Sequence, residues 1–232
     1  VCGLPHAALA FEALDSRLLF EQKLSDGDLV TPGTIIASVS GDARSILSAE
    51  RTALNFMCHL SGIATLTSQF VSQITHTDAK MCCTRKTIPG LRASQKYAVR
   101  CGGGSNHRFG LDDAILIKDN HIAVSGGITN ALEAAKSSAG HLVKIEIEVD
   151  TLEQFEEALS TGADCVLLDN FSVERLKEAV QINRGRVALE ASGGVKLDTV
   201  RAIAESGVDY ISSSQITMSA STFDIGLDIE VR

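Results

Sequence analysis

The sequence of 232 residues predicts an α/β protein in which repeated βα units surround a parallel sheet or barrel. From Lys80 onward, short apolar runs alternate with windows of helical periodicity. In the second half this unit repeats roughly every 20 to 25 residues, a length that short βα units can have. Two phrases, Thr-Gly-Ala-Asp at 161–164 and Ser-Gly-Val-Asp at 206–209, each end a helix with glycine and lead into an apolar strand. This repeat favours a barrel.

The elements can be placed in order along the chain. Apolar runs at residues 7–14 and 33–39, separated by turn signals, predict a helix followed by short strands. Apolar residues recur at helical spacing from about Ser45 to His59, which predicts a long helix. Strands are predicted at residues 79–83, 114–117, 144–149, 165–168, 187–190 and 210–213. Helices are predicted after several of them, at residues 128–137, 151–161, 173–183 and 197–206.

Composition excludes several classes of protein. With 44% hydrophobic residues the chain can bury a core of one large domain, or of one domain and a small companion. It has no run of roughly 20 apolar residues and no signal peptide, so we expect a cytoplasmic protein. The six cysteines show no Cys-x-x-Cys spacing, which indicates reduced thiols rather than a zinc site. The net charge of -8 argues against nucleic acid or an anionic membrane as a partner, so an anionic ligand needs a local basic patch.

Such a patch lies between Lys80 and His121. This segment holds eight basic and three acidic residues, a net charge of +5. A solvated charged face would look similar. However, three glycines at 102–104 precede His107 and Arg108, which is typical of a loop that approaches a ligand closely.

Polar residues also follow the predicted strands, where a (β/α) barrel builds its active site. Arg85, Lys86, Arg108 and Lys118 predict a site for a ligand with several negative charges. The turn at 192–194 precedes the helix predicted from Leu197, so its main-chain N–H groups and the N-terminus of that helix could receive a phosphate. The serines at 212–214 would form the opposite wall, although ordinary turns use the same residues. Glu148 and Asp169 suit ribose hydroxyls or a hydrated magnesium ion, or they are salt-bridge partners. A glycosidase carboxylate pair would not explain so many cations.

Several strings make the sequence similar to a known family. These are Glu-Arg-Thr-Ala-Leu-Asn at 50–55, Ser-Gly-Ile-Ala-Thr at 61–65, Thr-Arg-Lys-Thr at 84–87, Lys-Tyr-Ala-Val at 96–99, the segment 102–108, Lys-Asp-Asn-His at 118–121, Leu-Leu-Asp-Asn at 167–170 and Glu-Ala-Ser-Gly-Gly at 190–194. The chain thus resembles the quinolinate phosphoribosyltransferases, type II phosphoribosyltransferases also called nicotinate-nucleotide pyrophosphorylases (carboxylating). The match spans almost the whole sequence.

The resemblance implies a fold and a reaction. The fold would be a small α/β sandwich from residues 1–49 and 221–232 and an incomplete barrel of about seven βα units from residues 50–220. The reaction would transfer phosphoribose from phosphoribosyl pyrophosphate to quinolinate, release pyrophosphate and carbon dioxide, and give nicotinate mononucleotide for NAD biosynthesis. Magnesium would be the cofactor, and the active form would be a homodimer.

The resemblance also implies roles for individual residues. Lys118, Glu148 and Asp169 would be catalytic, with Glu148 and Asp169 near the metal and the ribose. The quinolinate carboxylates would be held by Arg85, His107, Arg108 and Lys118, with Arg51 from the second subunit. Lys86 and Lys118 would face the phosphates. Thr84 would also bind substrate, and Ser192, Gly193, Gly194, Ser213, Ser214 and Gln215 would hold the 5-phosphate.

The sequence departs from the family in two respects, and two alternative functions are compatible with it. The family often has glycine at Ser214 and histidine at Met218, and its subunits usually begin with a further N-terminal segment, so we expect residues before Val1 and an incomplete small domain. A relative associated with molybdenum transport shares some of the strings, although the 118–121 string favours the quinolinate enzyme. A non-catalytic sensor of a phosphorylated metabolite is the second alternative, and Glu148 and Asp169 beside the cations argue against it.

Overall fold

A computed structural model describes residues 1–230, which divide into two compact units. The first, called the terminal unit, comprises Val1–Ser68, Thr87–Gly104 and the described residues from Ile216 onward. The second, the barrel unit, comprises Gln69–Lys86 and Ser105–Gln215. Each unit is built from segments distant in the sequence.

The terminal unit packs helices against a two-stranded sheet. Its elements are α1 (Leu4–Leu14), β1 (Leu19–Gln22), β2 (Ala37–Ser40), the greater part of α2 (Ala43–Ile74), α3 (Arg92–Cys101) and most of α9 (Gln215–Met218). Strands β1 and β2 are antiparallel, with Leu19 opposite Ser40. One face of α2, with Ile46, Ala49, Ala53 and Met57 at spacings of three and four residues, shares a buried core with α1. The C-terminal tail contributes to this core through Ile225 and Leu227.

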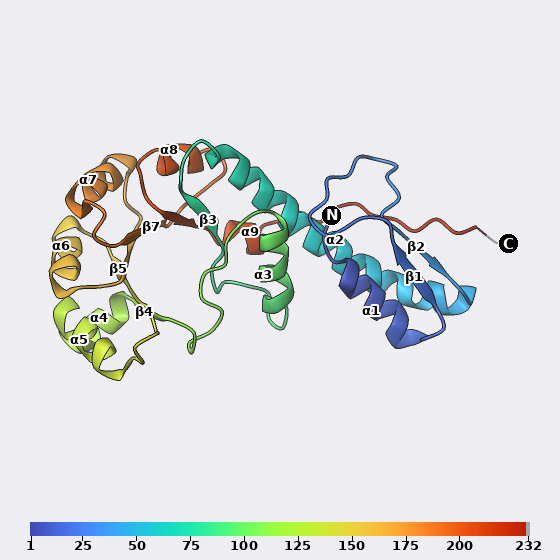
Figure 1. Cartoon of the computed structure of the whole chain (residues 1–232), viewed down its shortest axis with the longest axis horizontal. Coiled ribbons are helices and arrows are strands. Elements are labelled where there is room, and N and C mark those ends of the chain that lie inside the picture. Colours follow the sequence, from blue (N-terminus) through green and yellow to red (C-terminus); the bar gives the residue numbers. More distant parts are fainter. Residues whose placement is uncertain (231–232) are drawn as a thin grey trace. The chain divides into compact units, whose positions relative to one another are not determined.

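The barrel unit contains six parallel strands, β3 (Lys80–Cys82), β4 (Ile115–Ile117), β5 (Ile145–Val149), β6 (Cys165–Asp169), β7 (Ala188–Ser192) and β8 (Tyr210–Ser212). Their order in the sheet is β3-β8-β7-β6-β5-β4. The helices of this unit are α4 (Asp119–Ser125), α5 (Ile128–Ser138), α6 (Leu152–Thr161), α7 (Val173–Asn183) and α8 (Val200–Ala204). Figure 1 shows α5, α6, α7 and α8 in an arc outside the curved sheet.

The barrel is incomplete, as the family resemblance implied, and its described sheet has six strands where that resemblance implied about seven βα units. Strands β3 and β4 are the two ends of the sheet. At the free edge of β3, Ser105 forms a single parallel bridge with Cys82, and its main chain bonds Met81 and Cys83. A seventh strand at this place is therefore reduced to one residue.

The predicted strands and helices of the second half are confirmed, and local chemistry explains their ends. Thr151 caps α6 by accepting a hydrogen bond from the Gln154 N–H, and Ser172 caps α7 in the same way. Gly162 ends α6 in the left-handed conformation, with φ of 80°.

Several bounds differ from the prediction. The predicted helix at 45–59 is the first half of α2, which continues to Ile74, and the predicted helix at 197–206 is shortened to α8. The expected domain boundary at residues 49 and 50 falls inside α2, and the last two residues of the expected 221–232 segment lie outside the described residues. Helix α3 was not predicted because two of its buried positions are the polar residues Gln95 and Lys96. They interrupt the regular spacing of apolar residues by which a helix is recognised in a sequence.

Candidate functional site

A pocket of about 630 Å³ lies at the carboxyl ends of the barrel strands. All the predicted site residues except Arg51 line it: Thr84, Arg85, Lys86, His107, Arg108, Lys118, Glu148, Asp169, Ser192, Gly193, Gly194, Ser213, Ser214 and Gln215. The same lining also includes Leu116, Leu167, Asn170, Glu190, Val195, Lys196 and Ser212. Barrel topology brings these residues together because parallel strands end at one edge of the sheet.

Positive charges crowd one part of this pocket. Burial, followed by the nearby charge of Arg85, lowers the pKa of the Arg108 guanidinium. The negative charges of Glu146 and Asp113 act in the opposite direction. Arg108 Nη1 donates to the carbonyl of Ala114 at 3.2 Å, whereas its Nε is buried without a hydrogen-bond partner among the described residues. Two guanidinium groups that line one pocket and repel each other electrostatically favour an anionic ligand, which would relieve this repulsion.

His107 connects this cationic part to buried acids. Its Nδ1 accepts a hydrogen bond from the main-chain N–H of Arg108 at 2.8 Å. Its Nε2 lies 3.0 Å from Glu146 Oε2 and 3.6 Å from Glu190 Oε1. Both carboxylates come from strands of the barrel, Glu146 from β5 and Glu190 from β7.

A second part of the pocket contains carboxylates from two adjacent strands, β5 and β6. Lys118 Nζ lies 2.5 Å from Glu148 Oε2, and Asn170 Nδ2 donates to Asp169 Oδ2 at 2.6 Å. Burial and then the negative charge of Glu148 raise the pKa of Asp169, while Lys118 and Lys86 act in the opposite direction. The carboxylates of Glu148 and Asp169 therefore interact electrostatically with each other across the pocket, as two ligands of one cation or one ribose would.

The loop after β7 is suited to a phosphate group. Gly193 and Gly194 have φ of 87° and 61°, which side-chain-bearing residues rarely adopt. A Cβ on Gly193 would lie 2.2 Å from Asn170 Oδ1 and 2.8 Å from the Asn170 main-chain nitrogen. Across the pocket, Ser213 Oγ donates to the Val195 carbonyl at 3.1 Å. These contacts fix a loop with its main chain at the pocket.

One detail of the phosphate prediction is wrong. The sequence predicted that a helix beginning at 197 would direct its N-terminus toward the phosphate. Helix α8 begins only at Val200, after a turn closed by the Thr199 N–H and the Lys196 carbonyl. The main chain of the glycine loop, rather than a helix terminus, is available at the pocket.

Arg51 is the predicted site residue that does not line the pocket. It lies on α2 in the terminal unit, and its side chain is 75% exposed. Among the described residues, its one ion pair is with Glu50, at 3.9 Å. Its assignment to the site of a second subunit stays a prediction.

Sequence reasoning missed Glu146 as part of the site. The signal was present in Ile-Glu-Ile-Glu at 145–148, where two glutamates alternate with isoleucines along a barrel strand. Because strand residues two apart share a face, Glu146 lies on the same face as Glu148. The prediction from sequence used only Glu148, the polar residue near the end of this strand.

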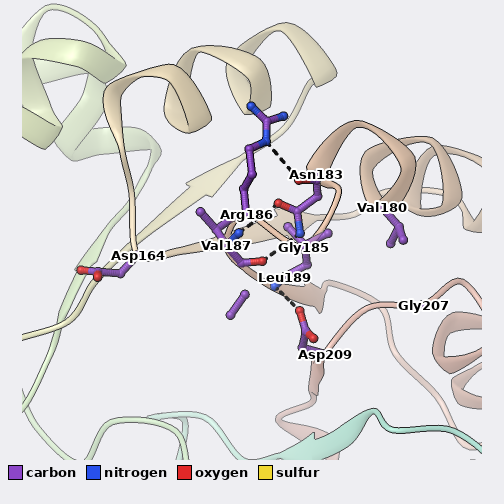
Figure 2. A pocket seen from close by; sticks show the side chains of 10 residues that line it. Asp164, Val180, Asn183, Gly185, Arg186, Val187, Leu189, Gly207 and Asp209 are labelled. Carbon is purple, nitrogen blue, oxygen red and sulfur yellow. Dashed lines mark hydrogen bonds between the residues drawn. The ribbon is translucent and has the colours of Figure 1, made fainter.

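A second cavity, of about 420 Å³, lies at the opposite ends of the strands, near the starts of β6, β7 and β8 (Figure 2). Its polar groups bond one another: Leu189 N–H donates to Asp209 Oδ2, and Asn183 Nδ2 donates to the Val187 carbonyl (Figure 2). Arg186 donates to the Asn183 carbonyl. These bonds hold the amino-terminal ends of the strands. In a barrel, residues on this face contribute to stability and not to the active site.

Within residues 1–230, no helix combines the length and apolar character needed to cross a membrane. The described part of the chain thus provides no helical membrane span.

Comparisons with known proteins agree over nearly the whole chain. The model of the quinolinate phosphoribosyl transferase C-terminal domain matches residues 63–228, and that of the N-terminal domain matches residues 1–61. A probable nicotinate-nucleotide pyrophosphorylase (carboxylating) of Bacillus subtilis is 44% identical over 219 residues, which cover 94% of this chain and 76% of that protein. The nicotinate-nucleotide pyrophosphorylase (carboxylating) of Mycobacterium leprae is 47% identical over 216 residues, 92% of this chain and 75% of that protein.

Solved structures give the same result. The structure of nicotinate-nucleotide pyrophosphorylase from Ehrlichia chaffeensis has a TM-score of 0.95 at 44% identity and covers 99% of this chain and 84% of that one. The corresponding structure from Francisella tularensis has a TM-score of 0.92 at 46% identity, with 96% and 79% covered. With both family models and a pocket of matching chemistry, the chain belongs to the quinolinate phosphoribosyltransferase family.

Proposed function

We propose that the chain transfers phosphoribose from phosphoribosyl pyrophosphate to quinolinate with decarboxylation, giving nicotinate mononucleotide, pyrophosphate and carbon dioxide. This is a pentosyltransferase reaction of NAD biosynthesis. The proposal depends most on one observation: the crowded guanidiniums of Arg85 and Arg108 share a pocket with Glu148, Asp169 and a glycine loop. Relatives at 44% and 47% identity carry the name of this activity.

The two parts of the pocket fit the two substrates. Quinolinate carries two carboxylates, which guanidinium groups can bind bidentately, and Arg85 and Arg108 supply two such groups. The phosphate of ribose would contact the main chain at 192–194 and the hydroxyls at 213–214. Lys118, which lines the pocket and is paired with Glu148, would contact both substrates.

The chemistry follows from this positioning. A bond forms between the ring nitrogen of quinolinate and C1 of ribose while the bond from C1 to pyrophosphate breaks. The positive charge that develops on the ribose would be stabilised by Glu148 and Asp169. The bond to the neighbouring carboxylate then breaks, its electron pair stays on the ring carbon beside the charged nitrogen, and a proton adds there. Holding both substrates in line would supply much of the rate enhancement.

We also propose Mg²⁺ as the cofactor. Glu148 and Asp169 offer the oxygen ligands that this ion prefers. The negative charge of Glu148 raises the pKa of Asp169, as expected for two carboxylates that face the same part of the pocket. Lys118 already occupies one oxygen of Glu148, so the two residues would hold the ion chiefly through water and pyrophosphate. When bound, the ion would neutralise charge on the departing pyrophosphate.

A homodimer is a further part of the proposal, with Arg51 contributed to the site of the partner subunit. The support is the exposed side chain of Arg51, which has one ion pair at 3.9 Å within its own chain. We place the enzyme in the cytoplasm because its six cysteines are all free in the described chain, as in a reducing compartment.

The experiment uses quinolinate labelled in the carboxyl group next to the ring nitrogen. We expect labelled carbon dioxide and nicotinate mononucleotide only when phosphoribosyl pyrophosphate and Mg²⁺ are both present. Lys118→Ala should abolish the release, whereas Lys144→Ala should not, since Lys144 pairs with Asp164 before β6, at the opposite end of the barrel strands. Metabolite binding without any release would refute the reaction and favour a sensor.

A further inference from the structure

A group of three ionisable side chains lies at and beneath the floor of the pocket. His107, Glu146 and Glu190 place a ring nitrogen and two carboxylate oxygens within 4.8 Å of one another. Their side chains are 13%, 11% and 6% exposed. His107 and Glu190 line the pocket, whereas Glu146 does not. The group is therefore built into the barrel interior and reaches the substrate space through His107 and Glu190.

The hydrogen bonds of His107 determine its tautomer. Because Nδ1 accepts the main-chain N–H of Arg108, that nitrogen carries no proton in this arrangement. The ring proton is then on Nε2, which lies 3.0 Å from Glu146 Oε2. Glu146 thus holds the ring from below, and the ring in turn holds the main chain of Arg108.

Glu190 completes the group from the next strand but one. Its Oε1 lies 3.6 Å from His107 Nε2 and has no hydrogen-bond partner among the described residues. The charged and polar groups that face this cluster are Arg108 from the same loop as His107, Cys165 on β6, and Ser212 on β8. Cys165 donates to Glu146 Oε1 at 3.3 Å, and burial raises the pKa of its thiol, so it supplies no further charge.

We propose that Glu146 and Glu190 are positioning residues of the reaction, which act through His107 to fix the place of the Arg108 main chain in the quinolinate part of the pocket. This inference rests on the proposed function. Neither carboxylate needs to contact quinolinate, since each acts on a residue that lines the pocket. Removing the Glu146 carboxylate would weaken quinolinate binding, whereas removing the charge of Glu190 would change how that binding depends on pH. Both changes would leave the phosphate loop at 192–194 in place.

The charge of Glu190 changes near neutral pH. Burial, followed by the negative charge of Glu146, raises the pKa of Glu190 to about 7, while His107 and Ser212 act in the opposite direction. Glu190 is therefore protonated below neutral pH and ionised above it. Its ionisation adds a second buried negative charge beside Glu146, which disfavours a ligand with two carboxylates. Quinolinate binding should weaken as the pH rises through 7.

The experiment compares Glu146→Gln, Glu190→Gln and the control Glu157→Gln, whose side chain bonds Thr129 outside the pocket. Glu146→Gln replaces a charged acceptor of the His107 hydrogen bond with a neutral amide oxygen. It should therefore raise the KM for quinolinate roughly fivefold to tenfold, with little change in kcat or in the KM for phosphoribosyl pyrophosphate. Glu190→Gln, which mimics the protonated acid, should match the wild type at pH 6 and bind quinolinate more tightly than the wild type at pH 8. Glu157→Gln should follow the wild type at both pH values.

A second measurement is independent of activity. In ¹⁵N NMR spectra at pH 7.5, His107 of the wild type should have an unprotonated Nδ1 and a protonated Nε2. Glu146→Gln should shift these resonances, and Glu157→Gln should not. The proposal would be overturned if active Glu146→Gln and Glu190→Gln variants both kept the quinolinate KM and the pH profile of the wild type. A protonated Nδ1 of His107 would overturn it as well. Failure of the wild type to form nicotinate mononucleotide would instead refute the proposed reaction.

Discussion

The glycine loop after β7 allows a matched pair of substitutions, Gly193→Ala and Gly194→Ala. Both residues have positive φ, so each substitution costs about 1–2 kcal/mol for placing a side chain in the left-handed region. Nothing lies within 4 Å of a Cβ on Gly194. A Cβ on Gly193 would instead be 2.2 Å from Asn170 Oδ1 and 2.8 Å from the Asn170 main-chain nitrogen.

The second of these contacts determines the magnitude. A side-chain rotation could move Asn170 Oδ1, but the main-chain nitrogen is held by a hydrogen bond to the Ser192 carbonyl at 2.9 Å. Overpacking of this kind costs a further 1–3 kcal/mol or so, hence Gly193→Ala should be destabilised by about 2 kcal/mol more than Gly194→Ala. Urea unfolding of both variants, with equal slopes, measures this difference. Unfolding free energies within about 0.5 kcal/mol of each other, the usual spread for independent substitutions, would refute the reasoning.

Three further predictions address other parts of the molecule. The pKa of Glu190 is about 7 in the folded protein and near 4.5 in the unfolded chain. Between pH 5.5 and pH 8, the free energy of unfolding of the wild type should therefore fall by about 2 kcal/mol more than that of Glu190→Gln. An equal fall for both proteins, measured by urea unfolding at the two pH values, would contradict this. Arg85→Lys should raise the KM for quinolinate roughly tenfold, because lysine cannot form a bidentate pair with a carboxylate; an unchanged steady-state KM would place the carboxylates elsewhere. Arg51→Ala and Lys118→Ala subunits should each be inactive alone and should recover about a quarter of the wild-type activity when mixed. The reason is that half of the dimers would then hold one intact site. No recovery would exclude a shared site.

The second half of the fold could be predicted because local signals agree there. Each strand of the barrel is a short apolar run, and each following helix has its own cap or terminal glycine, such as Thr151 and Gly162. The terminal unit gave weaker signals. Helix α3 buries Gln95 and Lys96, and Gln95 bonds the His59 ring and the Thr217 carbonyl, so its stability depends on partners distant in the sequence.

The site could be predicted where residues follow strands directly. Glu148 and Asp169 were found in this way, and so was the glycine loop. Glu146 was not, because its position near the start of β5 is not at the strand end where barrel sites lie, and only the folded barrel places it against His107. The pKa of Glu190 was likewise unpredictable from sequence, since it depends on burial and on a carboxylate from another strand.

The proposed reaction requires that one pocket of the barrel unit bind both substrates. A crystal structure of the enzyme with quinolinate and an unreactive analogue of phosphoribosyl pyrophosphate would show whether it does. We predict the quinolinate carboxylates at Arg85 and Arg108, the ribose at Glu148 and Asp169, and the phosphate against Gly193. Electron density for quinolinate at any other place, with this pocket filled only by solvent, would contradict the claim.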